Sequence, residues 1–319
     1  MSNLQKVTVL GGGVLGGQIA WHSAFKGKEV VVYDISNAAL DRCRAAHEQY
    51  AAIYLAEVGA TDPDIADTRS RLTYTTVLAT AAAGRDLVIE AVPEIPDLKI
   101  QVYREMAPLL SPDTLVATNS STLLPRDFAD VTGRPAKYCA MHFANMIWAM
   151  NLLEIMAHPG TADETLAAAT EYAIEIGMIP IPVRKEQNGY ILNTWFVQLL
   201  NASQTLVTNG IATPEDIDRT YLIVNPGAPR GPMGAFDMVG METAYNVVAH
   251  WGSVTGDEQM LANARYIKEN FLDKGKLGLQ TGEGYYTYPD PAYADPGFLA
   301  VPDISRAADI AALARPRQP

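Results

Sequence analysis

Short apolar runs alternate with stretches of helical spacing through the first 187 residues of the chain. Several of these runs are almost wholly apolar, which is typical of strands in a sheet that helices cover on both faces. This alternation predicts an α/β domain with a parallel, doubly wound sheet over residues 1–187. The predicted strands are Lys6–Leu10, Glu29–Asp34, Asp86–Val92, Thr114–Asn119, Tyr138–Ala144, Asn151–His158 and Ile179–Lys185, with Arg71–Thr76 as a weaker candidate. The predicted helices between them are Ala38–Val58, Leu98–Leu110 and Asp163–Met178.

The pattern changes after residue 187, and residues 188–319 are predicted to form an all-helical domain. Its first helix, Gly189–Asn209, is so apolar that it needs cover on several sides. A second subunit would supply part of that cover, so we expect a homodimer. The further predicted helices are Pro214–Val224, Gly234–His250 and Asp257–Phe271, and Tyr285–Tyr288 is a possible short strand.

Composition narrows the class of protein. The chain has 319 residues, a formal charge of −12, 19% charged residues and 48% hydrophobic residues, which excludes a disordered chain. The acidic balance disfavours nonspecific nucleic-acid binding, and no apolar run approaches the ~20 residues that cross a membrane. The start lacks a secretory pattern, and the two cysteines, Cys43 and Cys139, have no metal-ligand spacing. We therefore expect a cytoplasmic protein without a metal site.

A glycine-rich segment follows the first predicted strand and opens a helix. Gly11, Gly13 and Gly16 match the pattern G-x-G-x-x-G in the strand–turn–helix context that makes it specific. Gly11 would allow the tight turn, Gly13 the close approach of a pyrophosphate, and Gly16 the packing of helix on strand. Val14 and Leu15 begin the helix whose free N–H groups would meet the phosphates. A purely structural glycine turn is the alternative.

Asp34 supports a dinucleotide site. It ends the second predicted strand, eighteen residues after Gly16, where a carboxylate accepts hydrogen bonds from the adenosine ribose. The residues that follow, Ile35, Ser36 and Asn37, provide no arginine for a 2′-phosphate. The sequence therefore predicts a Rossmann-type domain that binds NAD rather than NADP.

A histidine and a glutamate form the second candidate site. His142 lies in one apolar strand and Glu154 follows twelve residues later in the next. A nearby carboxylate would orient the imidazole and stabilise its charged form, as a general base requires. A histidine buried in the core for packing is the alternative reading of His142.

Several blocks that contain these residues occur in a characteristic order. They are Gly11–Gly16 with Asp34, Ile89–Glu94 with Lys99, Asn119–Ser121, His142–Asn145 with Glu154, Asn188–Asn193, Gly231–Gly234 and Thr281–Tyr286. With these blocks in register, the sequence resembles the 3-hydroxyacyl-CoA dehydrogenase family over nearly its full length. The resemblance implies an NAD-dependent enzyme that oxidises an L-3-hydroxyacyl-CoA, of short chain, to the 3-oxoacyl-CoA. It also implies that residues 188–319 serve substrate binding and dimerisation.

The resemblance also implies roles for individual residues. His142 matches the catalytic histidine, and Glu154 the glutamate paired with it. Ser121 and Asn193 match residues that contact the substrate's hydroxyl or carbonyl oxygen, and Asn145 a supporting residue beside the histidine. From the residues alone, Ser121 and Asn193 could equally be helix- or turn-capping residues.

Three further positions match the cofactor side of the family's site. Glu94, Lys99 and Asn119 correspond to residues near the nicotinamide end. The resemblance therefore adds them to the glycine loop and Asp34 as predicted NAD contacts.

Two departures from the family's pattern keep other substrates open. Ala144 and Met146 stand where the family has an aromatic residue and a proline. Residues 35–72 contain no lysine where the family places lysines that meet CoA phosphates, although four arginines occur there, Arg42, Arg44, Arg69 and Arg71. The alternatives are a dehydrogenase of a non-CoA 3-hydroxy acid, similar to gulonate or carnitine dehydrogenases, and a noncatalytic, crystallin-like NAD-binding protein.

Overall fold

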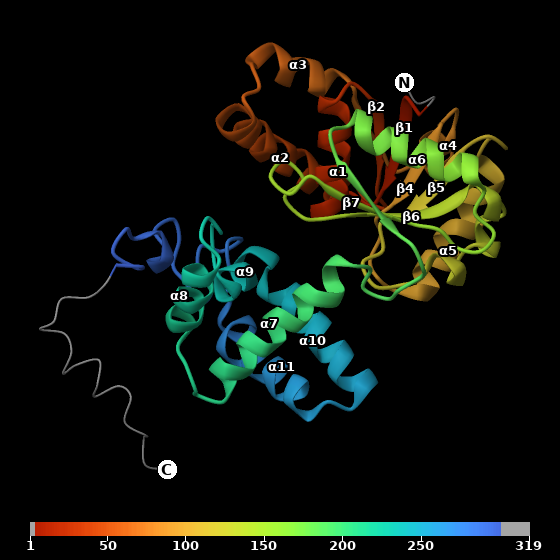
Figure 1. The fold of residues 1–319 in the computed structure, drawn as a ribbon. Helices are drawn as coiled ribbons and strands as arrows, with labels where there is room; N and C mark the ends of the chain where they lie inside the picture. The colour runs from red at the N-terminus through yellow and green to blue at the C-terminus, as the bar shows by residue number, and fades with distance from the viewer. Residues whose placement is uncertain (1–3, 301–319) are drawn as a thin grey trace, which may run out of the picture. The chain divides into compact units, whose positions relative to one another are not determined.

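The computed structural model describes residues 4–300. Contacts within the chain divide it into two units, Met1–Thr194 and Trp195–Pro319, which are described separately below (Figure 1). Residues 301–319 of the predicted helical domain lie outside the described residues.

An eight-stranded sheet organises the first unit, with strand order β3-β2-β1-β4-β5-β6-β7-β8. Adjacent residues of each inner strand belong to different apolar clusters, because successive side chains of a strand point to opposite faces. Val9 belongs to an apolar cluster with residues of α1 (Val14–Phe25), α2 (Asn37–Ile53) and α6 (Asp163–Glu175). Leu10 belongs to another, with residues of α4 (Leu78–Ala82) and α5 (Pro96–Met106). The strands are β1 (Lys6–Leu10), β2 (Glu29–Tyr33), β3 (Leu72–Thr75), β4 (Leu87–Glu90), β5 (Leu115–Thr118), β6 (Tyr138–Phe143), β7 (Leu152–Met156) and β8 (Ile179–Val183). The predicted α/β fold with both faces covered is confirmed.

The prediction that all strands are parallel is wrong at one edge. Strand β7 runs antiparallel to β6, and β8 runs parallel to β7. Only residues 144–151 connect β6 to β7, whereas a parallel crossover needs a dozen residues or more. The chain therefore turns back on itself, and this antiparallel pair carries His142 and Glu154.

The helices of the first unit differ from the prediction around the second one. The predicted helix Ala38–Val58 is α2 followed by a single π-helical turn at Tyr54–Val58. The short helix α3 was not predicted; its Thr61 cap and Asp64 form a capping box, which is a recognisable start signal. The helices are α1 (Val14–Phe25), α2 (Asn37–Ile53), α3 (Asp62–Ser70), α4 (Leu78–Ala82), α5 (Pro96–Met106) and α6 (Asp163–Glu175).

The second unit is helical in its described part. Its helices are α7 (Leu192–Thr208), whose first residues belong to the first unit, α8 (Pro214–Val224), α9 (Pro232–Val239), α10 (Met241–Thr255) and α11 (Glu258–Asn270). The predicted helix Gly234–His250 is two helices, because Gly240 has a φ of +89° and interrupts the helical backbone. The possible strand Tyr285–Tyr288 forms only isolated bridges. No helix among residues 4–300 is long and apolar enough to cross a membrane.

Candidate active site

The glycine loop between β1 and α1 has the geometry of a phosphate cradle. Gly11 has a φ of +102°, and a Cβ there would lie 2.6 Å from the Ala91 carbonyl oxygen. A Cβ at Gly16 would collide with the Gly11 carbonyl oxygen, so the helix packs against the loop without side chains between them. Gly13 begins α1 with no side-chain cap, and nothing lies within 4 Å of a Cβ built on it. The space beside Gly13 is therefore open, as the close approach of a pyrophosphate to the backbone requires.

Asp34 lies beside this loop at the end of β2. One carboxylate oxygen accepts a hydrogen bond from the Gly12 backbone N–H at 2.8 Å, and the other accepts one from Ile35 at 2.8 Å. Ile35 is 84% exposed and begins the segment without a cation. The residues present thus fit NAD: an acid next to the glycine loop, and uncapped N–H groups for the phosphates.

His142 and Glu154 face each other across β6 and β7. The strand register pairs them directly, so both side chains lie on the same face of the sheet. The Nδ1 atom of His142 lies 2.8 Å from Oε2 of Glu154, and the side chains are 4% and 1% exposed. A carboxylate only accepts, so Nδ1 carries a proton and the neutral ring keeps its lone pair on Nε2. Among residues 4–300, no side chain or backbone group hydrogen-bonds to Nε2.

The second oxygen of Glu154 fixes the segment that follows residue 189. It accepts hydrogen bonds from the backbone N–H groups of Ile191 at 2.8 Å and Leu192 at 2.9 Å. The preceding residue, Tyr190, has a φ of +54°, and its ring centroid lies 4.8 Å from that of His142. Glu154 thus binds Nδ1 of the imidazole and also holds the backbone segment that places the Tyr190 ring beside His142.

Tyr190 was not predicted as a site residue. Burial raises its pKa well above the ordinary value of a tyrosine, and its hydroxyl has no hydrogen-bond partner among the described residues. An aromatic side chain in an apolar block is more often a core residue, so the sequence offers no local signal for this contact.

Ser121 and Asn193 lie close together in the structure. The side-chain amide of Asn193 donates to the Ser121 backbone carbonyl at 3.3 Å, and both residues are half-buried. Asn119 lies two residues before Ser121, directly after β5, and its Oδ1 accepts a hydrogen bond from the Phe143 N–H at 2.9 Å. This last contact ties the end of β5 to the residue after His142.

Asn145 is placed differently from the other predicted residues. It is exposed, and its side chain has no hydrogen bond within the described part of the chain. The turn next to it is held by Gln18 of α1, whose Oε1 accepts from the Met146 N–H at 2.8 Å. Met146 has a φ of +58°, so this contact fixes an uncommon backbone conformation. Gln18 was also missed; a buried glutamine on an apolar helix was its signal.

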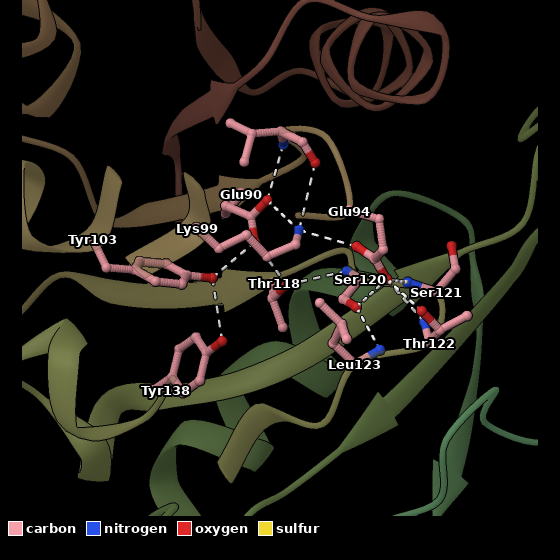
Figure 2. Close-up of polar contacts among 11 residues, drawn as sticks. Glu90, Glu94, Lys99, Tyr103, Thr118, Ser120, Ser121, Thr122, Leu123 and Tyr138 are labelled. Atoms are coloured by element: carbon pink, nitrogen blue, oxygen red, sulfur yellow. Dashed lines mark hydrogen bonds and ion pairs between the residues drawn. The ribbon is translucent and has the colours of Figure 1, made fainter. Parts of the chain in front are cut away.

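Glu94 and Lys99 belong to a polar cluster beside Ser121 (Figure 2). Lys99 is 1% exposed and pairs with Glu90 at 2.6 Å and with Glu94 at 3.2 Å. Partial burial works to raise the pKa of Glu94, but the charge of Lys99 and hydrogen bonds from Ser120 and Thr122 outweigh it and hold the pKa below its usual value.

The candidate residues follow the carboxyl ends of neighbouring strands of the sheet. The glycine loop follows β1, Asp34 follows β2, Glu94 follows β4 and Ser121 follows β5. In doubly wound folds ligands bind at this edge of the sheet. Residues 4–300 contain no group of three or more His, Cys, Asp or Glu side chains that could hold a metal ion.

A dinucleotide cradle and a histidine–carboxylate pair in one α/β unit are the parts of an NAD-dependent dehydrogenase that acts on a CH–OH group. Comparison with known proteins specifies the family. The sequence profile of the 3-hydroxyacyl-CoA dehydrogenase NAD-binding domain matches residues 6–187, and that of the C-terminal domain matches residues 189–288. The chain therefore belongs to the 3-hydroxyacyl-CoA dehydrogenase family and is an NAD-dependent oxidoreductase.

Individual relatives match over most of their length. A probable 3-hydroxybutyryl-CoA dehydrogenase of Deinococcus radiodurans is 30% identical over 89% of this chain and 100% of its own. The structure of an (S)-3-hydroxybutyryl-CoA dehydrogenase from Ralstonia eutropha matches with a TM-score of 0.74 at 29% identity, over 90% of this chain and 100% of its own. A diketoreductase, described as catalysing dicarbonyl compounds, matches with a TM-score of 0.81 at 46% identity, over 90% of this chain and 100% of its own.

Proposed function

We propose that this protein oxidises the 3-hydroxyl group of a short-chain L-3-hydroxyacyl-CoA to the 3-oxo group, with His142 as the general base. One observation supports the proposal above the others: His142 is buried, paired through Nδ1 with Glu154, and keeps its basic nitrogen unbonded within the described residues. A core histidine that serves packing alone would have both nitrogens satisfied, as His22 has.

Each group of residues has a separate role in this reaction. Nε2 of His142 takes the hydroxyl proton, and Glu154 stabilises the imidazolium that results. Ser121 and Asn193 hold the substrate oxygen while it changes from hydroxyl to carbonyl, which lowers the barrier by orientation. Bound NAD supplies the hydride acceptor. The glycine loop and Asp34 bind the cofactor, and Asn119 contacts it near the nicotinamide end.

The test of this assignment is His142→Ala. The variant should lose at least about 10³-fold in kcat, because the proton acceptor is gone, while NADH binds as before. NADH affinity is measured by fluorescence titration, and the far-ultraviolet circular dichroism confirms the fold. A variant that retains its turnover would disprove the role of His142, and the noncatalytic alternative predicts no turnover even in the unmodified protein.

The acyl-CoA substrate is supported by the family and by relatives named 3-hydroxybutyryl-CoA dehydrogenases. These names point to a four-carbon chain. Acetoacetyl-CoA is therefore the expected substrate in the direction of reduction, with NADH consumption followed at 340 nm as the readout.

A second candidate is a 3-hydroxy acid or dicarbonyl compound without CoA. The diketoreductase is 46% identical to this chain, well above the 29–30% of the quoted CoA-dependent relatives. Three arginines of residues 35–72 already form ion pairs within the protein. Arg44 pairs with Asp41 at 2.6 Å, Arg69 with Glu48 at 2.6 Å and Arg71 with Asp67 at 2.5 Å. These arginines are less available to phosphates than free cations would be.

One assay separates the two candidates. The kcat/KM for NADH-dependent reduction is measured with acetoacetyl-CoA, with free acetoacetate and with a 3,5-dioxo ester. A preference for the thioester of about 100-fold or more supports the first candidate, and turnover of the free compounds alone supports the second. His142→Ala is assayed with each substrate, since both candidates use the same base.

We also propose that the protein is a cytoplasmic homodimer. Exposed apolar side chains support the dimer: Ile191, just before α7, is 45% exposed, and Trp195, in its first turn, is 53% exposed. Two free cysteines, Cys43 and Cys139, fit a reducing compartment. Sedimentation velocity at micromolar concentration tests the first statement, because a monomer at that concentration contradicts it, and cell fractionation tests the second.

A further inference from the structure

A single carboxylate oxygen organises the loop that carries Ser121. Oε1 of Glu94 accepts hydrogen bonds from the Ser120 hydroxyl at 2.5 Å, the Ser121 N–H at 3.0 Å, and both the N–H and the hydroxyl of Thr122 at 3.0 Å. The Ser120 hydroxyl in turn accepts from the Leu123 N–H at 2.9 Å. Figure 2 shows these bonds converging on Glu94. The backbone of residues 120–122 therefore takes its position from one side chain that follows β4.

Lys99 fixes the other oxygen of that carboxylate. Its ammonium lies 3.2 Å from Oε2 of Glu94, 2.6 Å from Oε1 of Glu90 and 3.4 Å from the Val92 carbonyl oxygen. Three acceptors match the three protons of an ammonium group. At 1% exposure, Lys99 has no proton left to donate to a bound molecule.

Glu90 holds Lys99 in turn, within the core of the unit. It is 0% exposed, and its Oε2 accepts from the Tyr103 hydroxyl at 2.9 Å and the Thr118 hydroxyl at 2.8 Å. Tyr103 lies on α5 and Thr118 on β5, so the carboxylate that binds the ammonium is tied to both of these elements. A buried charge is costly unless all of its hydrogen bonds are made, so the ammonium of Lys99 is held in one position. That position in turn determines where the carboxylate of Glu94 lies.

The carbonyl side of the same loop is held by a different segment. Asn193 donates to the Ser121 carbonyl at 3.3 Å, and Asn188 donates to the Thr122 carbonyl at 2.8 Å. Residues 191 and 192, within this segment, donate to Glu154, the partner of His142. Residues 120–122 are thus held on one side by Glu94 and on the other by residues 188–193, which Glu154 binds. All of these residues lie in the first unit.

We propose that Glu94 is a positioning residue that acts through Ser121, and that Lys99 keeps it in place. This deepens the assignment above and rests on the proposed function, in which Ser121 holds the substrate oxygen. The alternative role, direct contact with the cofactor, predicts that Glu94 contributes to NAD affinity. Positioning predicts instead that it contributes to turnover.

The experiment is a double-mutant cycle of Glu94→Gln and Ser121→Ala. A glutamine keeps the volume but weakens the acceptor for four donors and presents an amide N–H to Lys99. With acyl substrate and NADH saturating, Glu94→Gln should lower kcat about 10- to 100-fold, the range for losing hydrogen bonds to a charged group. The Kd of NADH should change by less than about threefold. In the Ser121→Ala background the same substitution should cost less than about threefold, because residues that act as a unit are not additive.

Two outcomes of the cycle itself would overturn the proposal. One is a loss of NADH affinity with unchanged kcat, which assigns Glu94 to the cofactor. The other is a double variant whose loss equals the product of the two single losses. Thr122→Val is the matched control, because it removes one of the four donors and should change kcat less than about threefold; a loss as large as that of Glu94→Gln also contradicts the proposal.

The role of Lys99 is tested with Lys99→Met, for which kcat and the Kd of NADH are measured as for Glu94→Gln. A positioning role predicts a lower kcat with little change in the Kd of NADH. Removing the ammonium leaves Glu90 buried without its partner, so this variant is assayed only after circular dichroism shows it to be folded. The Glu94 cycle stands whether or not it folds. Failure of the proposed function is separate: it would show as activity of His142→Ala, whereas failure of the positioning role shows only in the cycle.

Discussion

Glu154→Gln is the substitution that tests the active-site geometry most directly. In the structure the two oxygens of Glu154 make different contacts, because Oε2 lies 2.8 Å from His142 whereas Oε1 accepts two backbone N–H groups. A glutamine has one acceptor oxygen. Two N–H donors hold that oxygen at Ile191 and Leu192, so the amide NH₂ is turned toward His142.

This orientation reverses the tautomer of the imidazole. Nδ1 must then accept from the amide, and the proton moves to Nε2, which can no longer take one from the substrate. The charge effect adds to this. A carboxylate and an imidazolium about 4 Å apart interact by ~4 kcal/mol at an effective dielectric constant of ~20, and a hydrogen bond to a charged group contributes ~1.5–3 kcal/mol. Taking ~3–4 kcal/mol as the loss in the transition state gives a decrease in kcat of about 10²- to 10³-fold.

The assay measures kcat and KM for the NAD-dependent oxidation of L-3-hydroxybutyryl-CoA, the direction in which Nε2 takes the proton, with NADH affinity from fluorescence. We expect the loss in kcat, with KM and NADH affinity within about threefold. The matched control is Glu175→Gln, which removes a carboxylate from an ion pair with Lys28 in the same unit, at a residue outside the proposed site. A Glu154→Gln variant that keeps more than about a third of the kcat would refute the reasoning, as would an equal loss in the control.

Three further predictions concern the same unit. Asp34→Ala should reduce discrimination against NADP at least about tenfold, because the carboxylate that repels a 2′-phosphate is gone. The ratio of kcat/KM with NAD to kcat/KM with NADP measures this discrimination. An unmodified enzyme that prefers NADP contradicts the role of Asp34. Tyr190→Leu should lower kcat about 3- to 30-fold, because it removes the ring beside His142. Tyr190→Phe should be nearly silent, because the hydroxyl has no partner among the described residues. Equal losses in the two variants would contradict a role for the ring. Burial lowers the pKa of both His22 and His47 from 6.5 to about 4. The free energy of unfolding is therefore at its full value above pH 6.5 and decreases as the pH falls toward 4, by up to ~3 kcal/mol for each histidine. Urea midpoints that do not change between pH 7 and pH 4.5 would show that burial does not shift these pKa values.

The sequence alone predicts the nucleotide end of the fold well. The glycine loop and Asp34 are mostly local features: Gly11 has a positive φ, a Cβ at Gly16 would meet the Gly11 carbonyl oxygen, and Asp34 accepts from the Gly12 N–H. A short motif therefore contains most of the constraint, although Gly11 is also limited by the Ala91 carbonyl oxygen after β4. The polar cluster around Lys99 is different. Its members Glu90, Tyr103, Thr118 and Tyr138 come from four elements, and nothing in any one segment shows that they meet.

Tyr190 shows a second limit of prediction. Its position depends on a left-handed backbone residue and on two N–H groups held by Glu154, which lies 36 residues earlier. Helical periodicity predicted a helix from Gly189, whereas α7 begins at Leu192 because Glu154 binds the N–H groups of Ile191 and Leu192 as the helix starts. A tertiary contact therefore overrides the local pattern there.

The pairing of His142 with Glu154 was predicted, although the strand direction that produces it was not. In a parallel arrangement the spacing of twelve residues would place no constraint on which side chains meet. In the observed antiparallel pair the register joins 143 with 153, 142 with 154 and 141 with 155, so an even separation brings the two side chains to one face. A strand that slips by one residue presents its other face. One residue inserted in the connection 144–151, if it shifted this register, would turn Glu154 away from the imidazole and bring the face of Leu153 and Ile155 to it. The length of that turn therefore determines the pairing of His142 with Glu154 as much as the two side chains do.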